Sequence, residues 1–513
     1  MMQIKQHLLK QGCRWLLPLG LLVCWWQTSL HGWMSQQILP DPAVILQTAR
    51  DFIPGDLLSE LPISLYRLAL GLAGGITAGI ILGVAFGLNG RVSRLILPLF
   101  TTLVQIPTLA WIPLLMLWLG IGEALKLTIL IKAVSVPVAL YTCTGIRQIS
   151  PKLSEMAKIL HLSRRMTLKR LVLPALFPYV MTGVRLALSQ GWVTLMAVEL
   201  LASSEGIGYL LVESRQLFMM DQVYICIAVI GVLGYAGEKL LLLLSHRWIR
   251  WPSGISGAVT QPAVPVVDPY GWILPVLLIG GWQWASASGW LNSVFFPAPR
   301  VVIRTLITGL QDGPLAQDLG VSIMRMLRGF FLGALAGVLC GLLSGNNAWL
   351  DRIFTPFFSA LRSVAIFAWL PLITAWFGLG ESARTVFIAL SAFFPMFLAI
   401  RQGMSQLPIT LIETGRVLRL SIPSRLRLLI LPGMLPDLFT GVRLGLMHAW
   451  VGTLGAEYFI SSDHGLGSMM MRAQQLLAAD RVMSGIILIA LVAALISFII
   501  NRAERQLSRW RYQ

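Results

Sequence analysis

The sequence predicts an all-α protein that crosses a membrane about twelve times and is built as two parallel six-helix repeats. Three observations predict this: an apolar composition, a series of apolar runs of about 20 residues, and a second half that repeats the first. Of 513 residues, 56% are apolar and 12% are charged, against about 25% charged residues in ordinary soluble domains. A helix needs about 20 apolar residues to cross about 30 Å of hydrocarbon. The composition therefore argues against a soluble globular enzyme.

The net charge is +18, from 40 Lys and Arg against 22 Asp and Glu. In a soluble chain this excess would indicate nucleic-acid binding, but here the basic residues gather in loops on one side of the apolar runs, as in membrane proteins. We therefore expect a lipid bilayer around the chain and no nucleic-acid partner. The five cysteines have no paired spacing that would indicate disulfides or zinc, so we expect packing roles for them and no metal site.

The first predicted span, 15–33, has no small-residue cleavage site after it, so we interpret it as an uncleaved span and not as a secretory signal. The other spans of the first half are predicted at 62–88, 95–119, 124–145, 174–198 and 222–245. Those of the second half are predicted at 271–290, 319–344, 353–378, 383–400, 432–456 and 482–500.

The charges of the loops predict the orientation. Basic loops near Arg91, at 147–170 and at 247–250 fall on one side, and the second half repeats this with 416–427 and 502–511. The opposite loops of the first half are acidic, with Asp41, Asp51, Asp56, Glu60, Glu205, Glu213 and Asp221. The excess of Lys and Arg predicts that both termini are cytoplasmic.

The second half repeats the first at an offset of 258 residues. The register aligns Arg67 with Arg325, Trp111 with Trp369, Pro113 with Pro371, Gly183 with Gly441, Arg185 with Arg443 and Glu199 with Glu457. Because each repeat has an even number of spans, both begin on the same side, so the repeats are parallel. We expect a first repeat at 1–250, a cytoplasmic linker rich in Pro, Gly, Ser and Val at 251–270, and a second repeat at 271–513.

The second span of each half has a glycine at every fourth position, which are Gly71, Gly75, Gly79, Gly83 and Gly87, then Gly329, Gly333, Gly337, Gly341 and Gly345. Such a stripe leaves a groove down one helix face and favours close helix packing where lipid supplies no hydrophobic drive. A groove lining a pore is the alternative interpretation.

The longest basic loops of the two halves, 150–174 and 407–432, correspond to one another. In the first, Leu153, Met156, Ala157 and Leu160 form one apolar face of a short helix. This helix either lies on the inner leaflet of the membrane or docks on a cytoplasmic partner. Its presence once in each half favours a partner with twofold symmetry.

These loops resemble the permease subunits of bacterial ABC importers, which carry a Glu-Ala-Ala motif, then a glycine and an apolar-Leu-Pro ending. The matching residues are Glu155, Met156 and Ala157 in the first loop, and Glu413, Thr414 and Gly415 in the second. The chain departs from the pattern at His161 and Arg419, where the family has glycine. Long runs such as PTLAWIPLLMLWLGIGE are similar to the nitrate, sulfonate and taurine group.

The resemblance implies the type I ABC importer permease fold and a place in a bacterial inner membrane. It implies transport of a small anionic solute, such as a sulfonate, taurine or nitrate, delivered by a periplasmic binding protein. No lysine follows a glycine, so a Walker A loop is missing. We expect no catalytic residue and no cofactor in this chain, with ATP and Mg bound by two separate ABC ATPase domains docked on the residues named above.

Three alternatives remain open at this stage. The same class of importer carrying a thiamine-precursor pyrimidine would have the same loops. A secondary transporter with parallel repeats would need paired acidic residues or histidines at the midplane for ion coupling. A membrane scaffold without transport activity is the third alternative.

Ionisable residues within apolar spans are functional candidates because their burial costs free energy. Lys132 lies in the middle of a span and aligns with Leu390, so it either favours an anionic solute, pairs with an acid such as Glu199, or extends toward the membrane surface. Further candidates for the translocation pathway are Trp111, Trp369, Arg185 and Arg443. Glu199 and Glu457, at outer helix ends, are candidates for a periplasmic gate.

Overall fold

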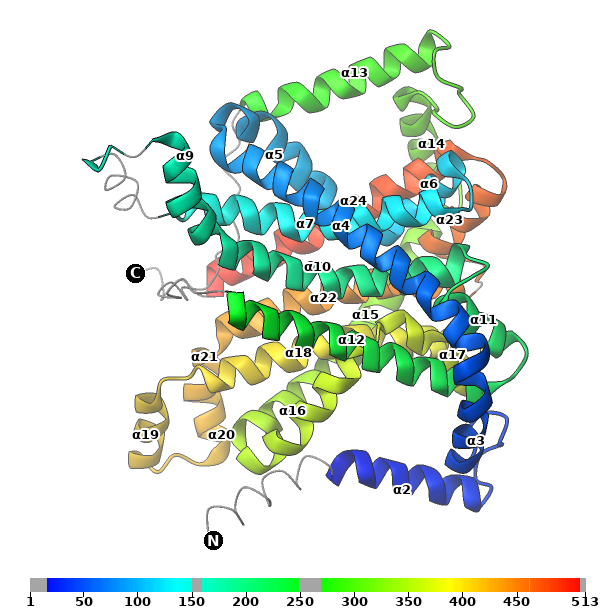
Figure 1. Ribbon diagram of the computed structural model, residues 1–513, viewed down its shortest axis with the longest axis vertical. Coiled ribbons are helices and arrows are strands. Elements are labelled where there is room, and N and C mark those ends of the chain that lie inside the picture. Colours follow the sequence, from blue (N-terminus) through cyan, green and yellow to red (C-terminus); the bar gives the residue numbers. More distant parts are fainter. Residues whose placement is uncertain (1–15, 150–158, 162, 249–268, 461, 508–513) are drawn as a thin grey trace.

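The computed structural model describes residues 16–149, 159–161, 163–248, 269–460 and 462–507. Within these ranges every regular element is a helix, and the long helices lie side by side in one bundle (Figure 1). The all-α class predicted from composition is confirmed. The four described cysteines, Cys24, Cys143, Cys226 and Cys340, are free thiols.

Outside the loops at 148–172 and 406–434, the two halves contain corresponding helices in the same order. The first half has α2 (Leu16–Leu30), α3 (Pro42–Phe52), α4 (Leu58–Leu88), α5 (Gly90–Val104), η3 (Thr108–Trp111), α6 (Ile112–Leu119), α7 (Glu123–Arg147), α9 (Arg164–Thr167), α10 (Leu173–Ala202), α11 (Ile207–Gln216) and α12 (Met220–Trp248). The second half has α13 (Ile273–Ala287), α14 (Pro299–Gln311), α15 (Leu315–Asn346), α16 (Ala348–Ser363), η6 (Ile366–Trp369), α17 (Leu370–Phe377), α18 (Glu381–Ser405), α19 (Ile409–Val417), α20 (Ile422–Arg425), η7 (Leu426–Ile430), α21 (Leu431–Gly433), α22 (Leu435–Phe459), α23 (Leu466–Gln475) and α24 (Ala479–Leu507).

Among the described residues, seven helices are long and apolar enough to cross a membrane, or up to ten if each bent pair is one span. The predicted spans 95–119 and 353–378 are wrong as straight helices. α5 meets η3 and α6 at 91°, and α16 meets η6 and α17 at 93°. Pro107 accounts for the first break because it has no N–H and an extended backbone with ψ 140°. Ala365 has the same extended backbone at the matching position without being a proline.

Two apolar helices are shorter than a membrane span. α2 and α13 have 15 residues each, or about 22 Å at 1.5 Å per residue. They lie at opposite edges of the bundle (Figure 1). The described part of these two predicted spans is therefore shorter than a full hydrocarbon core.

The glycine stripes are helix-packing surfaces. A Cβ atom added at Gly75 would lie 2.5 Å from the Cβ of Val134 on α7, and one at Gly83 would lie 2.5 Å from that of Thr142. In the second half, a Cβ at Gly333 would lie 2.1 Å from the carbonyl oxygen of Ala389 on α18. Of the two interpretations of the stripe, close packing is therefore the one the structure supports, with α4 on α7 and α15 on α18.

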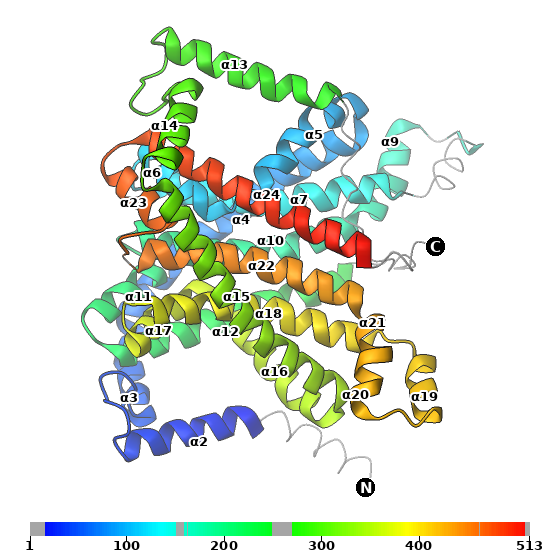
Figure 2. The ribbon, with the colours of Figure 1, turned by 180° about the vertical axis from the view of Figure 1, so that it is seen from behind.

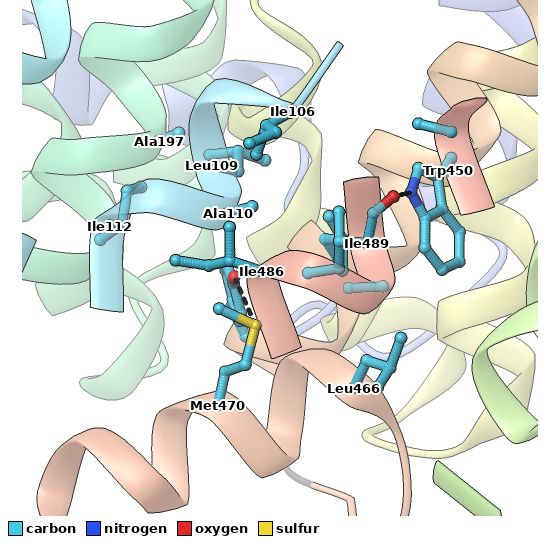
Figure 3. Close-up of a cluster of buried hydrophobic side chains, with 14 of the residues drawn as sticks. Ile106, Leu109, Ala110, Ile112, Ala197, Trp450, Leu466, Met470, Ile486 and Ile489 are labelled. Atoms are coloured by element: carbon cyan, nitrogen blue, oxygen red, sulfur yellow. Dashed lines mark hydrogen bonds between the residues drawn. The ribbon is translucent and has the colours of Figure 1, made fainter. Parts of the chain in front are cut away.

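The bent segments join the halves to one another. α6 packs on α23 and α24 of the second half, and α17 packs on α11 and α12 of the first. Figure 3 shows Leu109 and Ala110 of the first half beside Ile486 on α24, within one buried cluster. The break in the third predicted span of each half, 95–119 and 353–378, thus lets that half place a short apolar segment against the other half.

The bundle has two distinct ends. α9 lies at one end together with α19 and α20, while α11, α17 and α23 lie at the opposite end (Figures 1 and 2). We call these the α9/α19 end and the α11/α23 end. The described residues of the basic loops lie at the α9/α19 end, and the acidic loops of the first half lie at the other.

Candidate functional site

A buried charged cluster joins three helices of the first half at the α11/α23 end. Arg67 on α4 has a side chain that is only 2% exposed. Its Nη1 donates to Glu199 Oε1 on α10 at 3.0 Å, and its Nη2 donates to Glu123 Oε1 on α7 at 2.6 Å. Glu199 is fully buried and also accepts from the Ser64 hydroxyl at 2.8 Å and from the backbone N–H of Gly208 at 3.0 Å.

The second half repeats this cluster with the corresponding residues. Arg325 Nη1 donates to Glu457 Oε1 at 2.9 Å, and Arg325 Nη2 donates to Glu381. The Ser322 hydroxyl donates to Glu457 Oε1 at 2.7 Å, and the backbone N–H of Gly467 donates to Oε2 at 2.8 Å. Each half therefore holds one buried guanidinium between two carboxylates, and in the first half Glu205 adds a third, with its Oε2 3.6 Å from Arg67 Nη2. We call these the Arg67 cluster and the Arg325 cluster.

Each cluster also fixes the loop that enters the next short helix. The carbonyl of Glu205 accepts from Arg67 Nη1 at 2.9 Å, and that of His464 accepts from Arg325 Nη1 at 2.7 Å. The following glycine has φ 102° at Gly206 and φ 136° at Gly465, a conformation that L side chains rarely adopt. The loops before α11 and α23 are thereby tied to α4 and α15.

The structure adds partners to Glu199 and Glu457, the two gate candidates at outer helix ends. Their carboxylates are buried ion-pair partners of Arg67 and Arg325, and the gate role stays a prediction. The alternative pairing of Lys132 with Glu199 is wrong, since Glu199 pairs with Arg67. The arginines were the residues that sequence reasoning missed. The available signal was a charged residue inside an apolar span, repeated at the same register in both halves.

Lys132 on α7 lies against an aromatic ring. Its Nζ is 5.2 Å from the centroid of the Trp111 ring, within range of a cation–π interaction. Within the described ranges no ion pair of Lys132 is found. The indole Nε1 atoms of Trp111 and Trp369 are both buried and have no hydrogen-bond partner among the described residues. The structure thus brings Lys132 and Trp111 together, near the contact of the two halves.

The two candidate arginines of the fifth span lie in different environments. Arg443 forms an ion pair with Glu504 of α24. Arg185, its counterpart on α10, is exposed, and the residue of α12 that corresponds to Glu504 is Ser245. The structure therefore gives Arg443 a carboxylate partner on α24 and does not join it to Lys132.

The loops at the α9/α19 end are described in part. Glu155, Met156 and Ala157 lie outside the described residues. His161 and Arg419 have φ 46° and 47°, so both occupy the left-handed conformation that glycine adopts most easily. The departure from glycine at these positions therefore leaves the bend in place.

In the second loop, Glu413 on α19 is exposed, whereas Gly415 is buried. A Cβ atom at Gly415 would lie 2.8 Å from Leu429 Cδ1 on η7, so this position of α19 faces the Leu429 side chain of η7. Both loops present an apolar pair before the left-handed residue: Ile159 and Leu160 are 75% and 64% exposed, and Val417 and Leu418 are 81% and 61% exposed.

Within the described ranges, no group of three or more His, Cys, Asp or Glu side chains forms a possible metal site. The chemistry of the described site residues is that of ion pairing and hydrogen bonding.

Comparison with known families gives a match in each half. The family described as "Binding-protein-dependent transport system inner membrane component" matches residues 75–250 and again 331–511. SsuC of Bacillus subtilis, named as an aliphatic sulfonates transport permease protein, is 34% identical over 246 residues, which cover 47% of this chain and 89% of SsuC.

Two further relatives give the same picture. The taurine transport system permease protein TauC of Escherichia coli is 32% identical over 52% of this chain and 95% of its own length. The bicarbonate transport system permease protein CmpB of Synechococcus elongatus is 29% identical over 50% of this chain and 94% of its own length. Nearly the whole of each relative thus matches about half of this chain.

Proposed function

The chain belongs to the family of binding-protein-dependent transport system inner membrane components, and from this premise we propose that it forms the complete translocation pathway of an ATP-driven ABC importer. Its family and its relatives are transport permease subunits and not enzymes. The proposed cargo is a small anionic solute of the sulfonate, taurine, nitrate or bicarbonate kind. A periplasmic solute-binding protein delivers it, two ABC ATPase domains supply the energy, and both termini lie in the cytoplasm of a bacterium.

The observation that carries this proposal is the double match to one family. One chain supplies two permease units, 1–250 and 271–513, joined by a linker at 251–270. We expect one copy of the chain and two ATPase domains in each assembly. Native mass spectrometry of the purified assembly tests this, and two copies of the chain in each assembly would contradict it.

Transport itself is tested with vesicles that contain the assembly. Labelled taurine, an alkanesulfonate, nitrate, bicarbonate and a thiamine-precursor pyrimidine are offered separately, with and without ATP. Uptake of an anion that requires ATP supports the proposal. Uptake driven by an ion gradient without ATP would favour a secondary transporter, which the buried carboxylates do not support because Arg67 and Arg325 hold them in ion pairs.

Coupling to the ATPase is assigned to the two loops at the α9/α19 end. The exposed apolar pair in each loop supports this assignment, because such side chains in water favour burial against a partner. We propose that Glu155, Met156, Ala157 and His161 in one loop, and Glu413, Thr414, Gly415 and Arg419 in the other, contact one ATPase domain each.

Reversal of charge in these loops is expected to uncouple transport. Glu155→Lys or Glu413→Lys should lower both transport and stimulated ATP hydrolysis, with the larger loss for Glu155→Lys because the second loop departs further from the family pattern. The measurement is ATP-dependent uptake beside ATP hydrolysis in vesicles. Gln406→Lys, at an exposed position just before the second loop, serves as the control. Unchanged transport in both variants would instead favour loops that lie on the inner leaflet.

Lys132 is proposed as a cation of the pathway, together with Trp111, Trp369, Arg185 and Arg443. Lys132→Met removes the charge and keeps roughly the apolar length of the side chain, so anion uptake should fall severalfold at an unchanged melting temperature. Leu390→Met, at the matching position of the second half, is the control and should leave uptake unchanged. A fall in melting temperature with Lys132→Met would instead indicate a structural role for the ammonium. Unchanged uptake by this variant would contradict a role for Lys132 in the translocation pathway.

A further inference from the structure

The α11/α23 end differs in charge between the halves, although its fold is repeated. In the first half, the segments at this end (31–60, 119–126 and 203–221) carry the acids Asp41, Asp51, Asp56, Glu60, Glu123, Glu205, Glu213 and Asp221 and the cations Arg50, Lys126 and Arg215. In the second half, the matching segments (289–318, 377–384 and 462–480) carry the acids Asp312, Asp318, Glu381, Asp463 and Asp480 and the cations Arg300, Arg304, Arg384 and Arg472. Each half adds one histidine. Acids clearly outnumber cations in the first half only.

The contrast is sharpest on α11 and α23. Their register is fixed by structure, because Gly208 and Gly467 make the same backbone bond to Glu199 and Glu457. In this register, Glu213 on α11 corresponds to Arg472 on α23. The preceding loop has Glu205, whose side chain is 58% exposed, where the second half has His464, 43% exposed. Glu205 Oε2 lies 3.6 Å from Arg67 Nη2, and His464 Nδ1 lies 3.5 Å from Asp318 Oδ1. Glu213 is half-buried and Arg472 is exposed, so the reversal of charge between the halves is clearest at this pair.

In the second half these residues border a cavity of about 730 Å³. It is lined by Arg384, Arg472, His464, Glu381, Asp463 and Gln475, among others. Arg384 and Glu381 are paired with one another at 2.6 Å. Arg472 is exposed and uses its Nη1 to donate to the carbonyl of Ser462 at 2.8 Å. Because a guanidinium has five N–H donors, Arg472 retains donors for a carboxylate from outside.

We propose that this charge difference fixes the orientation of the solute-binding protein on the α11/α23 end. The inference rests on the proposed function, which supplies that partner. The lobe above the second half presents carboxylates that reach Arg472 and His464 at the cavity, and the lobe above the first half presents Lys or Arg toward Glu205 and Glu213. Two identical halves would offer a partner two equivalent orientations, related by half a turn. With opposite charges at matching positions, one orientation brings unlike charges of the two proteins together, and the other brings like charges together and is disfavoured.

The orientation is measured by photo-crosslinking from two matching positions. Gln216 and Gln475 occupy the last residues of α11 and α23, and both are exposed. Each is replaced in turn by a benzophenone amino acid in the complete assembly in nanodiscs. The partner is the purified solute-binding protein that stimulates ATP hydrolysis by this assembly. Cross-linked peptides are mapped by mass spectrometry.

In the wild-type background, position 216 should cross-link one lobe and position 475 the other, with at least a tenfold preference. The exchange of Glu213→Arg with Arg472→Glu keeps the net charge and should abolish or invert that preference. It should also raise the concentration of binding protein for half-maximal stimulation about tenfold at low salt, and less at 0.5 M salt because ions screen exposed charges. Melting temperatures of each single variant and of the exchange verify that the chain remains folded.

Equal yields on both lobes from both positions would overturn the inference, as would an unchanged preference in the folded exchange variant. Neither result would affect the proposed function, because stimulation by the binding protein would still be present. A wild-type assembly that no solute-binding protein stimulates would instead contradict the proposed function itself.

Discussion

Replacement of Arg67 by methionine is expected to lower the melting temperature and the folded yield of the chain more than any other single side-chain change considered. The substitution leaves the fully buried carboxylate of Glu199 without its guanidinium. Loss of one partner of a buried ion pair costs about 3–5 kcal/mol, because the remaining charge stays away from water. Arg325→Met should have a similar effect, since Glu457 is equally buried.

A double variant separates charge from packing. Arg67→Met combined with Glu199→Gln removes both members of the pair, so it should recover a substantial part of the melting temperature lost in Arg67→Met alone. Arg300→Met, at an exposed position of the same end of the bundle, is the control and should change the melting temperature little. The melting temperatures of the four proteins, the wild type included, are measured by thermal unfolding in detergent, and their folded yields by size-exclusion chromatography. An Arg67→Met chain as stable as the wild type would show that Glu199 is protonated or solvated in the bundle.

The two clusters mark the limit of what the sequence predicted about the site. The register of the halves aligned Arg67 with Arg325 and Glu199 with Glu457, so the duplication of these charges was visible. The contact between Arg67 and Glu199 was not visible in the sequence, because 132 residues separate them. Neither a periodicity nor a local motif relates α4 to α10. The sequence therefore predicted Glu199 as a gate residue without its partner; the structure pairs it with Arg67, and the gate role stays a prediction.

The sequence predicted the fold correctly where apolar runs form straight helices. The prediction failed where the backbone breaks inside an apolar run. Pro107 was a usable signal in the first half, since proline disfavours continuation of a helix. Ala365 gave no such signal, and its extended backbone matches that of Pro107 only because the duplicated fold imposes it. The break matters for the whole bundle, because it lets α6 and α17 pack on the opposite half.

The orientation of the chain stays a prediction from the charge of its loops, and the two halves differ in that charge. The acidic loops of the first half suggested an acidic face opposite the basic loops. The second half does not share this acidity, as Arg472 and His464 stand where the first half has Glu213 and Glu205. Once two copies of a permease unit are fused, a substitution in one half no longer appears in the other, so the exposed ends can diverge while the Arg67 and Arg325 clusters remain the same.

The glycine stripe leads to the second large expected effect, which is on Gly333. In Gly333→Ala, the new Cβ would lie 2.1 Å from the carbonyl oxygen of Ala389 and 3.0 Å from its Cα. These are backbone atoms of α18, so no side-chain rotation relieves the clash and α15 must move away from α18. The movement loosens contacts along the whole stripe, and overpacking of this kind typically costs about 1–3 kcal/mol.

Gly320→Ala is the matched control, because Gly320 lies on the same helix and a Cβ there would meet no atom within 4 Å. Alanine favours a helix over glycine by about 1 kcal/mol, so Gly320→Ala should keep or raise the melting temperature while Gly333→Ala lowers it by several degrees and reduces the folded yield. The same substitution at Gly75 should also lower the melting temperature, because its new Cβ would lie 2.5 Å from Val134 Cβ, which is fixed to the backbone, and 3.0 Å from the carbonyl oxygen of Ile131. Equal melting temperatures for Gly333→Ala and Gly320→Ala would mean that α15 and α18 do not pack as closely as the glycine stripe requires.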